Sequence, residues 1–193
     1  ISTSYGYNGN VRNRFFYQVY PIQLNIVNIF NLDQTFYETL ADDPFLRNAY
    51  QNHFDLGMGG TFYYTTNPES IPKSSFFYTR LQLDVAGNLL SAFRPLMKKD
   101  ANGAGMIWNT PYSQFVRGEI TIGKTWVFGQ NAGHSLATRV VAGAGYAYDN
   151  SSVLPFEKHF YAGGANSLRG WQARTVGPGL APMDNSFVIP NQT

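Results

Sequence analysis

A glycine-rich stretch near the end of the sequence has the residue types most suggestive of chemistry. It covers residues 162–179, AGGANSLRGWQARTVGPG, and places five glycines and two arginines around one tryptophan. Glycine-rich loops can bind phosphate, but no GxxxxGKS or GxxxxGKT motif occurs within this stretch, and its glycines do not lead from a buried strand into a helix. The guanidinium of Arg169 offers five donors in a fixed fork, which suits a carboxylate or a set of carbonyls. The stretch by itself therefore predicts no phosphate site and is typical of a glycine-rich surface loop with a solvated arginine.

Charged residues within alternating apolar and polar segments form a second group. They are three arginines and two acidic residues, all in the polar phase of their segments: Arg80, Asp84, Arg117, Glu119 and Arg139. On one face of a sheet these side chains can form an ion network, for which we expect a structural role. In a porin, the same charges would tune ion selectivity.

Other patterns of catalytic or metal-binding residues are missing from the sequence. It has no cysteine, which excludes thiolate metal sites and cysteine nucleophiles, and no GxSxG elbow that would present a serine. His53, His134 and His159 are far apart, and on the topology below His134 lies at the opposite end of the strands from the other two. We therefore expect no shared metal site, no cofactor and no enzyme. A net charge of +2 without a basic run argues against nucleic-acid binding.

The composition favours a β-protein of the membrane. Charged residues make up 13% of the 193 residues, about half the share in a soluble domain, and aromatic residues make up 16%. No run approaches the roughly 18 apolar residues of a membrane helix. Both features suit a membrane β-barrel, in which apolar residues occupy every second position of each strand. A soluble, tyrosine-rich β-sandwich would have a similar composition.

Alternation of apolar and polar residues indicates the strands that must position the charged groups. In residues 76–90, Leu81 and Leu83 fall on one face, and Arg80 and Asp84 fall on the other. Several such segments reach about 11 to 16 residues, whereas globular strands favour about 5 or 6, so their length favours the barrel over the sandwich. We predict strands near residues 1–7, 15–29, 54–65, 76–90, 115–128 and 138–148.

The connections between these strands alternate between short and long. Residues 67–74 and 129–134 are compact turns, whereas 31–52, which carries helix signals, and 94–113 are long. Outer-membrane barrels have short periplasmic turns and long extracellular loops, so another outer loop is expected to begin near Asp149. Five or six strands cannot close a barrel. We therefore expect part of a larger barrel, or one to which several chains contribute strands.

Two details refine this prediction. In residues 15–29 the alternation changes phase at Pro21, which cannot donate to a strand ladder, so a β-bulge is expected there. No signal peptide opens the sequence, so in an exported protein we expect these residues to be an internal piece.

Residues 154–171, LPFEKHFYAGGANSLRGW, resemble the sixth extracellular loop of the BamA/TamA superfamily of outer-membrane assembly and translocation factors. The residues that match are Phe156, Phe160, Gly163, Gly164, Leu168, Arg169, Gly170 and Trp171. Phenylalanine or tyrosine is commoner than tryptophan at the last position. The segment RTVGPG and the long loop at 31–52 look closest to versions from the Bacteroidetes.

The resemblance implies an all-β, antiparallel transmembrane β-barrel, with this chain supplying about five to six strands of a 16-strand barrel. It implies N-terminal POTRA domains and a weakly paired barrel seam. It also implies that a loop at about residues 149–185 folds into the lumen, where Arg169 packs against the inner wall of later strands. Glycines would let this loop approach the wall, and Trp171 would anchor its tip. An ordinary surface loop with a solvated arginine is the alternative.

The resemblance implies a protein of the bacterial outer membrane that assembles or inserts other proteins, or translocates them. The partners it implies are the lipid bilayer, client outer-membrane proteins and accessory assembly lipoproteins. The residues do not separate an assembly factor from a TamA-like or two-partner secretion relative. The strands alone equally allow a passive diffusion porin. POTRA repeats upstream would favour the first class, and a signal peptide directly before the first strand would favour the porin.

Overall fold

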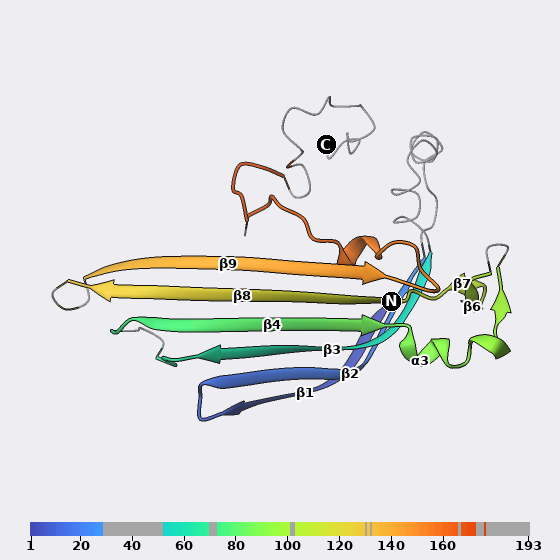
Figure 1. Ribbon diagram of the computed structural model, residues 1–193, viewed down its shortest axis with the longest axis horizontal. Coiled ribbons are helices and arrows are strands. Elements are labelled where there is room, and N and C mark those ends of the chain that lie inside the picture. Colours follow the sequence, from blue (N-terminus) through green and yellow to red (C-terminus); the bar gives the residue numbers. More distant parts are fainter. Residues whose placement is uncertain are drawn as a thin grey trace.

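The computed structural model shows one six-stranded antiparallel sheet in which each strand pairs with the next long strand along the chain (Figure 1). The strands are β1 (Ser2–Val11), β2 (Phe15–Val27), β3 (His53–Thr65), β4 (Phe76–Ala86), β8 (Phe115–Phe128) and β9 (His134–Ala147). The structure describes residues 1–28, 52–69, 73–100, 103–129, 131, 133–165, 167–172 and 176. The helix signals at 31–52 fall almost wholly outside these residues. Within them, no helix is long and apolar enough to cross a membrane.

The strand register separates two faces. Leu81 lies opposite Ile120 on one face, and Asp84 lies opposite Arg117 on the other. Nothing in the described part of the chain packs over the middle of the apolar face, where Leu83 is 41% exposed and Ile122 is 43% exposed. A sandwich would bury this face under a second sheet. The exposed apolar face instead fits a wall that contacts lipid.

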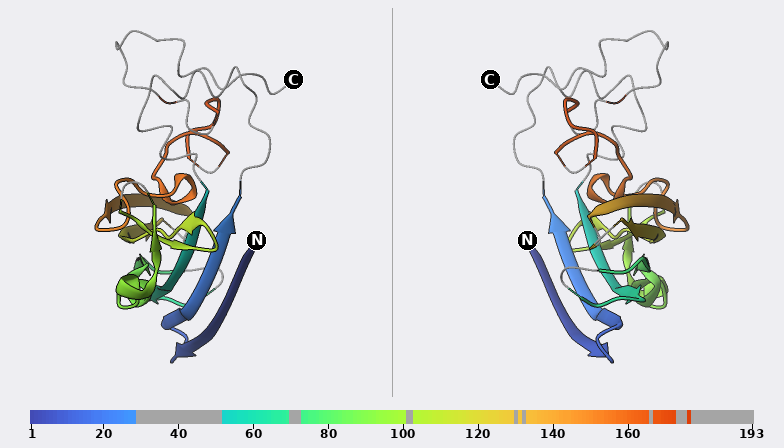
Figure 2. Two further views of the ribbon diagram at one scale, coloured as in Figure 1. Left: turned by 90° about the vertical axis from the view of Figure 1, so that its right-hand side faces the viewer. Right: turned by 90° about the vertical axis from the view of Figure 1, so that its left-hand side faces the viewer.

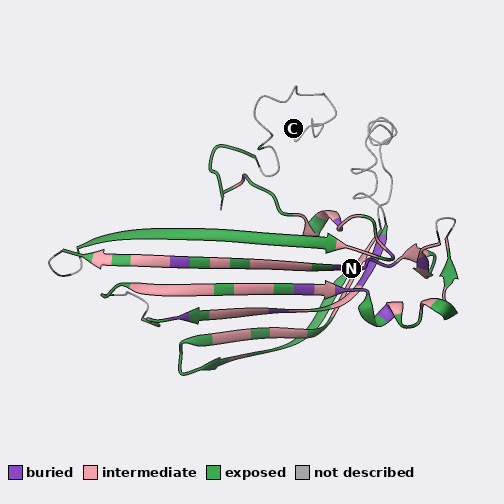
Figure 3. Cartoon of the chain, in the orientation of Figure 1, coloured by how far each residue is buried: buried purple, intermediate pink, exposed green. Residues whose placement is uncertain are grey.

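The sheet is also curved and twisted when seen along its strands (Figure 2). Figure 3 shows that β9, at one edge, is exposed along nearly its whole length, because it pairs only with β8 on one side. β1 occupies the other edge in the same way. The edge strands β1 and β9 do not pair with each other, so the six strands form an open sheet and not a closed barrel.

The phase change at Pro21 is a bulge, as the sequence predicts. The pairing of β2 with β3 shifts between Tyr20 and Gln23, and the pairing of β1 with β2 shifts between Tyr5 and Tyr7. One extra residue here restores the alternation, so that apolar residues on both halves of β2 stay on the same face.

The strand expected at 76–90 is shorter than the alternation suggests. β4 ends at Ala86, and the short helix α3 (Asn88–Ser91) follows. Gly87 between them has φ of 82°, and a Cβ there would lie 2.4 Å from the carbonyl oxygen of Ser113. The left-handed backbone turns the chain out of the sheet, although Leu89 continues the apolar pattern.

The long connection from β4 to β8 packs against the apolar face at one end. It contains α3, the 3-10 turn η1 (Arg94–Leu96), and a small sheet of β5 (Lys98–Lys99), β6 (Gly105–Ile107) and β7 (Thr110–Pro111). Phe54 of β3, Leu90 and Tyr112 form a buried cluster, against which Leu24 and Leu56 also pack. Protein covers the apolar residues at this end, so the lipid-facing part of the wall begins beyond them.

A single arginine on each face tests this assignment. We expect Ile122→Arg to destabilise the folded barrel by about 2–4 kcal/mol, because Ile122 lies near the middle of β8 on the apolar face. Thr121→Arg, one residue away on the polar face, should cost much less. Urea unfolding of the full-length protein in lipid vesicles measures both. Equal losses for the two variants would contradict a lipid-facing apolar surface.

Candidate functional site

The polar face of the sheet carries a charged cluster at the end nearest the long loops. Arg117 of β8 lies with Nη1 3.4 Å from Oδ2 of Asp84 and Nη2 3.2 Å from Oε2 of Glu119. Asp84 sits opposite Arg117 in the register of β4 and β8, and Glu119 is two residues along the same strand. Three of the five charged residues singled out from the sequence therefore meet.

The other two residues of that group lie elsewhere. Arg80 is opposite Thr121, Arg139 is opposite Gly123, and both arginines are exposed. Neither forms a hydrogen bond or ion pair with a described residue. Alternation placed all five residues on one face, but the strand register determines which of them lie at the same position along the strands and can therefore meet.

Arg117 also holds the segment that follows β9. Its Nε donates a 3.0 Å hydrogen bond to the carbonyl oxygen of Lys158, and its guanidinium lies 4.3 Å from the ring centre of Phe160. All three guanidinium nitrogens thus have acceptors, from two strands and from the loop. The arginine that ties this loop to the described wall is Arg117, in the strand, and not Arg169, in the loop.

Apolar side chains of the loop sit over glycines of β9. A Cβ on Gly143 would lie 2.5 Å from the ring of Phe160, and a Cβ on Gly145 would lie 2.6 Å from a methyl group of Leu154. Any larger residue at these two positions would displace the loop. Gly143 and Gly145, which alternate along β9, therefore leave the space on the polar face in which residues 154–160 pack.

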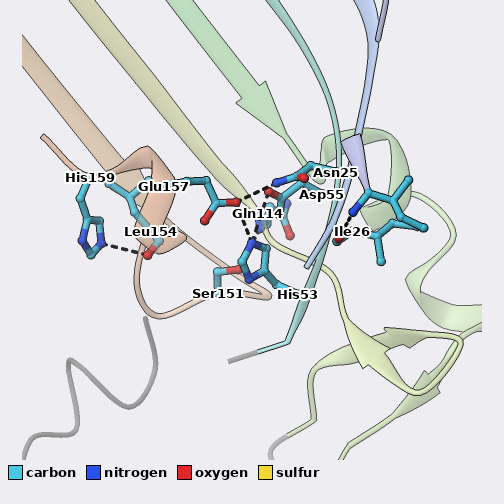
Figure 4. Close-up of polar contacts among 10 residues, drawn as sticks. Asn25, Ile26, His53, Asp55, Gln114, Ser151, Leu154, Glu157 and His159 are labelled. Atoms are coloured by element: carbon cyan, nitrogen blue, oxygen red, sulfur yellow. Dashed lines mark hydrogen bonds and ion pairs between the residues drawn. The ribbon is translucent and has the colours of Figure 1, made fainter. Parts of the chain in front are cut away.

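Glu157, in the 3-10 turn η3 (Phe156–Lys158), reaches the other side of the same face. Its Oε1 accepts a 2.7 Å hydrogen bond from Nδ2 of Asn25 in β2 and lies 2.9 Å from Nε2 of His53 in β3 (Figure 4). Burial raises the pKa of Glu157, but the hydrogen bond with His53 and the charges of His53 and Lys158 outweigh it, so the pKa lies below its ordinary value. Glu157 is therefore a carboxylate at neutral pH.

Adjacent loop residues thus contact strands far apart in the sheet. Glu157 contacts β2, and Lys158 contacts β8, which in a flat sheet would be three spacings or about 14 Å away. These contacts indicate that the polar face is the concave one. Residues 154–160 form the base of the loop. This loop base crosses the concave face and joins its two sides.

The glycine and arginine motif lies beyond this base. Gly164 donates a hydrogen bond to the carbonyl of Trp171, so the segment between them closes on itself. Gly163, Gly164 and Gly170 have φ of 96°, 85° and 90°. Within the described chain a Cβ on Gly170 would touch nothing, so its left-handed backbone is what requires glycine there.

The three large side chains of the motif, Leu168, Arg169 and Trp171, are exposed in the structure. Arg169 has no hydrogen bond or ion pair with any described residue. The wall against which the resemblance places it belongs to later strands. The packing of Arg169 in the lumen therefore stays a prediction.

Sequence analysis did not single out Asn25 or Glu157, placed Asp55 only in the polar phase of its strand, and considered His53 only as one of three separate histidines. Of the three histidines, His134 stacks on Phe128 near the β8–β9 turn, and Nε2 of His159 lies 3.0 Å from the carbonyl oxygen of Leu154. His53 instead meets two carboxylates, Asp55 and Glu157. The one available signal was the spacing of His53 and Asp55, which puts them on the same face of a strand.

Removing the guanidinium of Arg117 should release the loop base. We expect Arg117→Ala to destabilise the barrel by about 3–5 kcal/mol, because it leaves the largely buried Asp84 without its cation. Trypsin should then cleave faster after Lys158 in the full-length protein. Arg80→Ala, on the same face and without a described partner, is the matched control and should leave cleavage unchanged. Equal cleavage rates in both variants would show that Arg117 does not hold the loop.

Comparison with known proteins identifies the family. The model of the Omp85 superfamily domain matches residues 3–188, nearly the whole chain. No curated protein and no solved structure gives a significant match. Members of this superfamily are outer-membrane barrels that assemble or translocate proteins and are not enzymes. The match confirms that the chain resembles the BamA/TamA superfamily. The chain therefore belongs to the Omp85 superfamily, and its sheet is a segment of that superfamily's antiparallel outer-membrane β-barrel.

Proposed function

We propose that this barrel belongs to a factor that assembles or inserts proteins in the bacterial outer membrane, with the loop at about residues 149–185 packed in its lumen. The observation that carries the proposal is the position of residues 154–160 on the polar face, where Arg117, Gly143 and Gly145 hold them. Translocation of proteins across the membrane is the related activity within the same superfamily.

The two faces of the sheet support a loop inside the barrel. The apolar face is exposed where lipid would cover it, and the polar face is concave and carries the loop base. A loop held on the polar side lies in the water-filled interior of a barrel and away from the surrounding lipid. From this base, the tip with Arg169 can extend toward strands on the opposite wall.

The loop base also argues against a passive porin. In a porin, the polar face lines an open channel through which solutes diffuse. Here Glu157 and Phe160 cover that face from β2 to β9 at the end nearest the long loops. A loop anchored in this way closes part of the lumen, which suits a barrel that handles proteins at its wall. The partners we propose are the lipid bilayer, client outer-membrane proteins and accessory assembly lipoproteins.

Exchange of the motif arginine tests the proposed function. We expect Arg169→Ala to lower the levels of client barrels in the outer membrane of cells that depend on this protein, because the loop tip would lose its anchor on the opposite wall. Immunoblots of outer-membrane fractions measure these levels, and the heat-modifiable gel shift reports folding of the variant itself. Arg12→Ala, at the short β1–β2 turn, is the control. Normal client levels with an unchanged gel shift would contradict the proposal.

A further inference from the structure

Three potential metal ligands meet where the loop base contacts β3. They are His53, Asp55 and Glu157, and one ligand atom from each lies within 4.8 Å of the other two (Figure 4). Nε2 of His53 is 2.9 Å from Oε1 of Glu157 and 3.7 Å from Oδ2 of Asp55. Two ligands bound at about 2.0–2.2 Å in tetrahedral geometry stand about 3.3–3.6 Å apart, so small side-chain shifts would bring these atoms around one ion.

Asp55 gives a second, independent indication of a ligand. The residue is 4% exposed, and neither of its carboxylate oxygens has a hydrogen-bond partner among the described residues. Ser113 and Asn25 lie near it, but no donor meets hydrogen-bond geometry at either oxygen. Apart from the imidazole of His53, 3.7 Å from Oδ2, Asp55 has no ion-pair partner among the described residues, and a buried carboxylate that accepts no hydrogen bond points to an ion or a water.

A cavity gives an ion access to the three ligands, and the nearby carboxylates can neutralise its charge. A cavity of about 400 Å³ reaches the cluster and is lined by Asn25, Asp55, Asp84 and Glu157, among other residues. Two carboxylates next to one imidazole match the charge of a divalent cation. Asn25, which donates to Glu157, would orient that carboxylate as an outer partner of the site.

We propose that His53, Asp55 and Glu157 bind one divalent transition-metal ion, with Zn²⁺ the best match, and that this ion joins the loop base to the barrel wall. An imidazole nitrogen with two carboxylate oxygens suits zinc, whereas calcium and magnesium prefer shells made of oxygen alone. Water would complete the coordination. Nε2 of His53 binds the ion in the neutral imidazole with the ring proton on Nδ1, so binding releases a proton from His53 only when both ring nitrogens carry one.

The site has a structural consequence that does not depend on which client the barrel handles. His53 and Asp55 belong to β3, whereas Glu157 belongs to the loop. A bound ion would replace the contact between Glu157 and His53 with two metal–ligand bonds. The loop base would then be held at two places, by the ion at β3 and by Arg117 at β8.

Zinc titration of the full-length protein tests the site. Protein without a histidine tag is folded in detergent, stripped with a chelator and titrated with Zn²⁺ against a chromophoric competitor. We expect one zinc ion per chain. Asp55→Asn and Glu157→Gln should each weaken affinity at least about tenfold, since even groups that only orient a ligand cost this much when lost. His134→Ala and His159→Ala, which remove histidines outside the cluster, should bind like the unaltered protein.

A protease assay connects binding to the loop. Saturating Zn²⁺ should slow tryptic cleavage after Lys158 in the unaltered protein and not in Glu157→Gln. This variant keeps an oxygen acceptor for Asn25, and its side chain is partly exposed, so its folding should be preserved. Absence of stoichiometric zinc in the unaltered protein would overturn the proposal, whether or not the variants fold. Zinc affinity unchanged by both carboxylate substitutions would overturn it equally.

Discussion

The guanidinium of Arg117 is the group on which the arrangement of wall and loop depends. It lies in a largely buried position, so its charge must be balanced and its donors need acceptors. Asp84 and Glu119 provide the negative charge from the sheet, and the carbonyl of Lys158 accepts from Nε. The last acceptor is present only when the loop base lies on the wall. Removal of the loop would take away this acceptor and the ring of Phe160, so the loop and the wall stabilise each other.

This arrangement requires a strict register between the strands. Asp84 faces Arg117 across β4 and β8 because the two strands pair without a shift from Phe76 to Ala86. A slip by one residue would turn Arg117 toward the lipid face, at a cost of several kcal/mol. The bulge at Pro21 keeps the two faces separate in β2 as well. The alternation of apolar and polar residues changes phase there, and the extra residue of the bulge keeps the apolar side chains of both halves on one face.

Small residues on the strands complete the fit. Gly143 and Gly145 leave room for Phe160 and Leu154, and Gly123 lies beneath the ring of Tyr78. Glycine weakens a strand because it has no side chain to pack, yet here each one receives a large side chain from elsewhere. At these three positions on the polar face, glycine is present because a large side chain occupies the space that a Cβ would fill.

Much of the wall could be predicted from the sequence because strand alternation has a period of two. That period assigns Leu81 and Ile120 to one face and Asp84 and Arg117 to the other, without knowledge of any neighbour. The proline at the phase change indicated the bulge for a similarly local reason. The end of β4 was misjudged because Leu89 continues the alternation, whereas the backbone of Gly87 decides where the strand stops.

Contacts between distant segments were decided only by the tertiary structure. Alternation places a residue on a face but does not set its height relative to other strands, so Arg80 and Arg139 could not be separated from Arg117 in advance. The meeting of His53 with Glu157, 104 residues later, depends on how the loop base crosses a concave sheet. The sequence by itself therefore determined the two faces and the family motif. The folded chain determined which side chains meet, because strand register and sheet curvature are properties of several strands together.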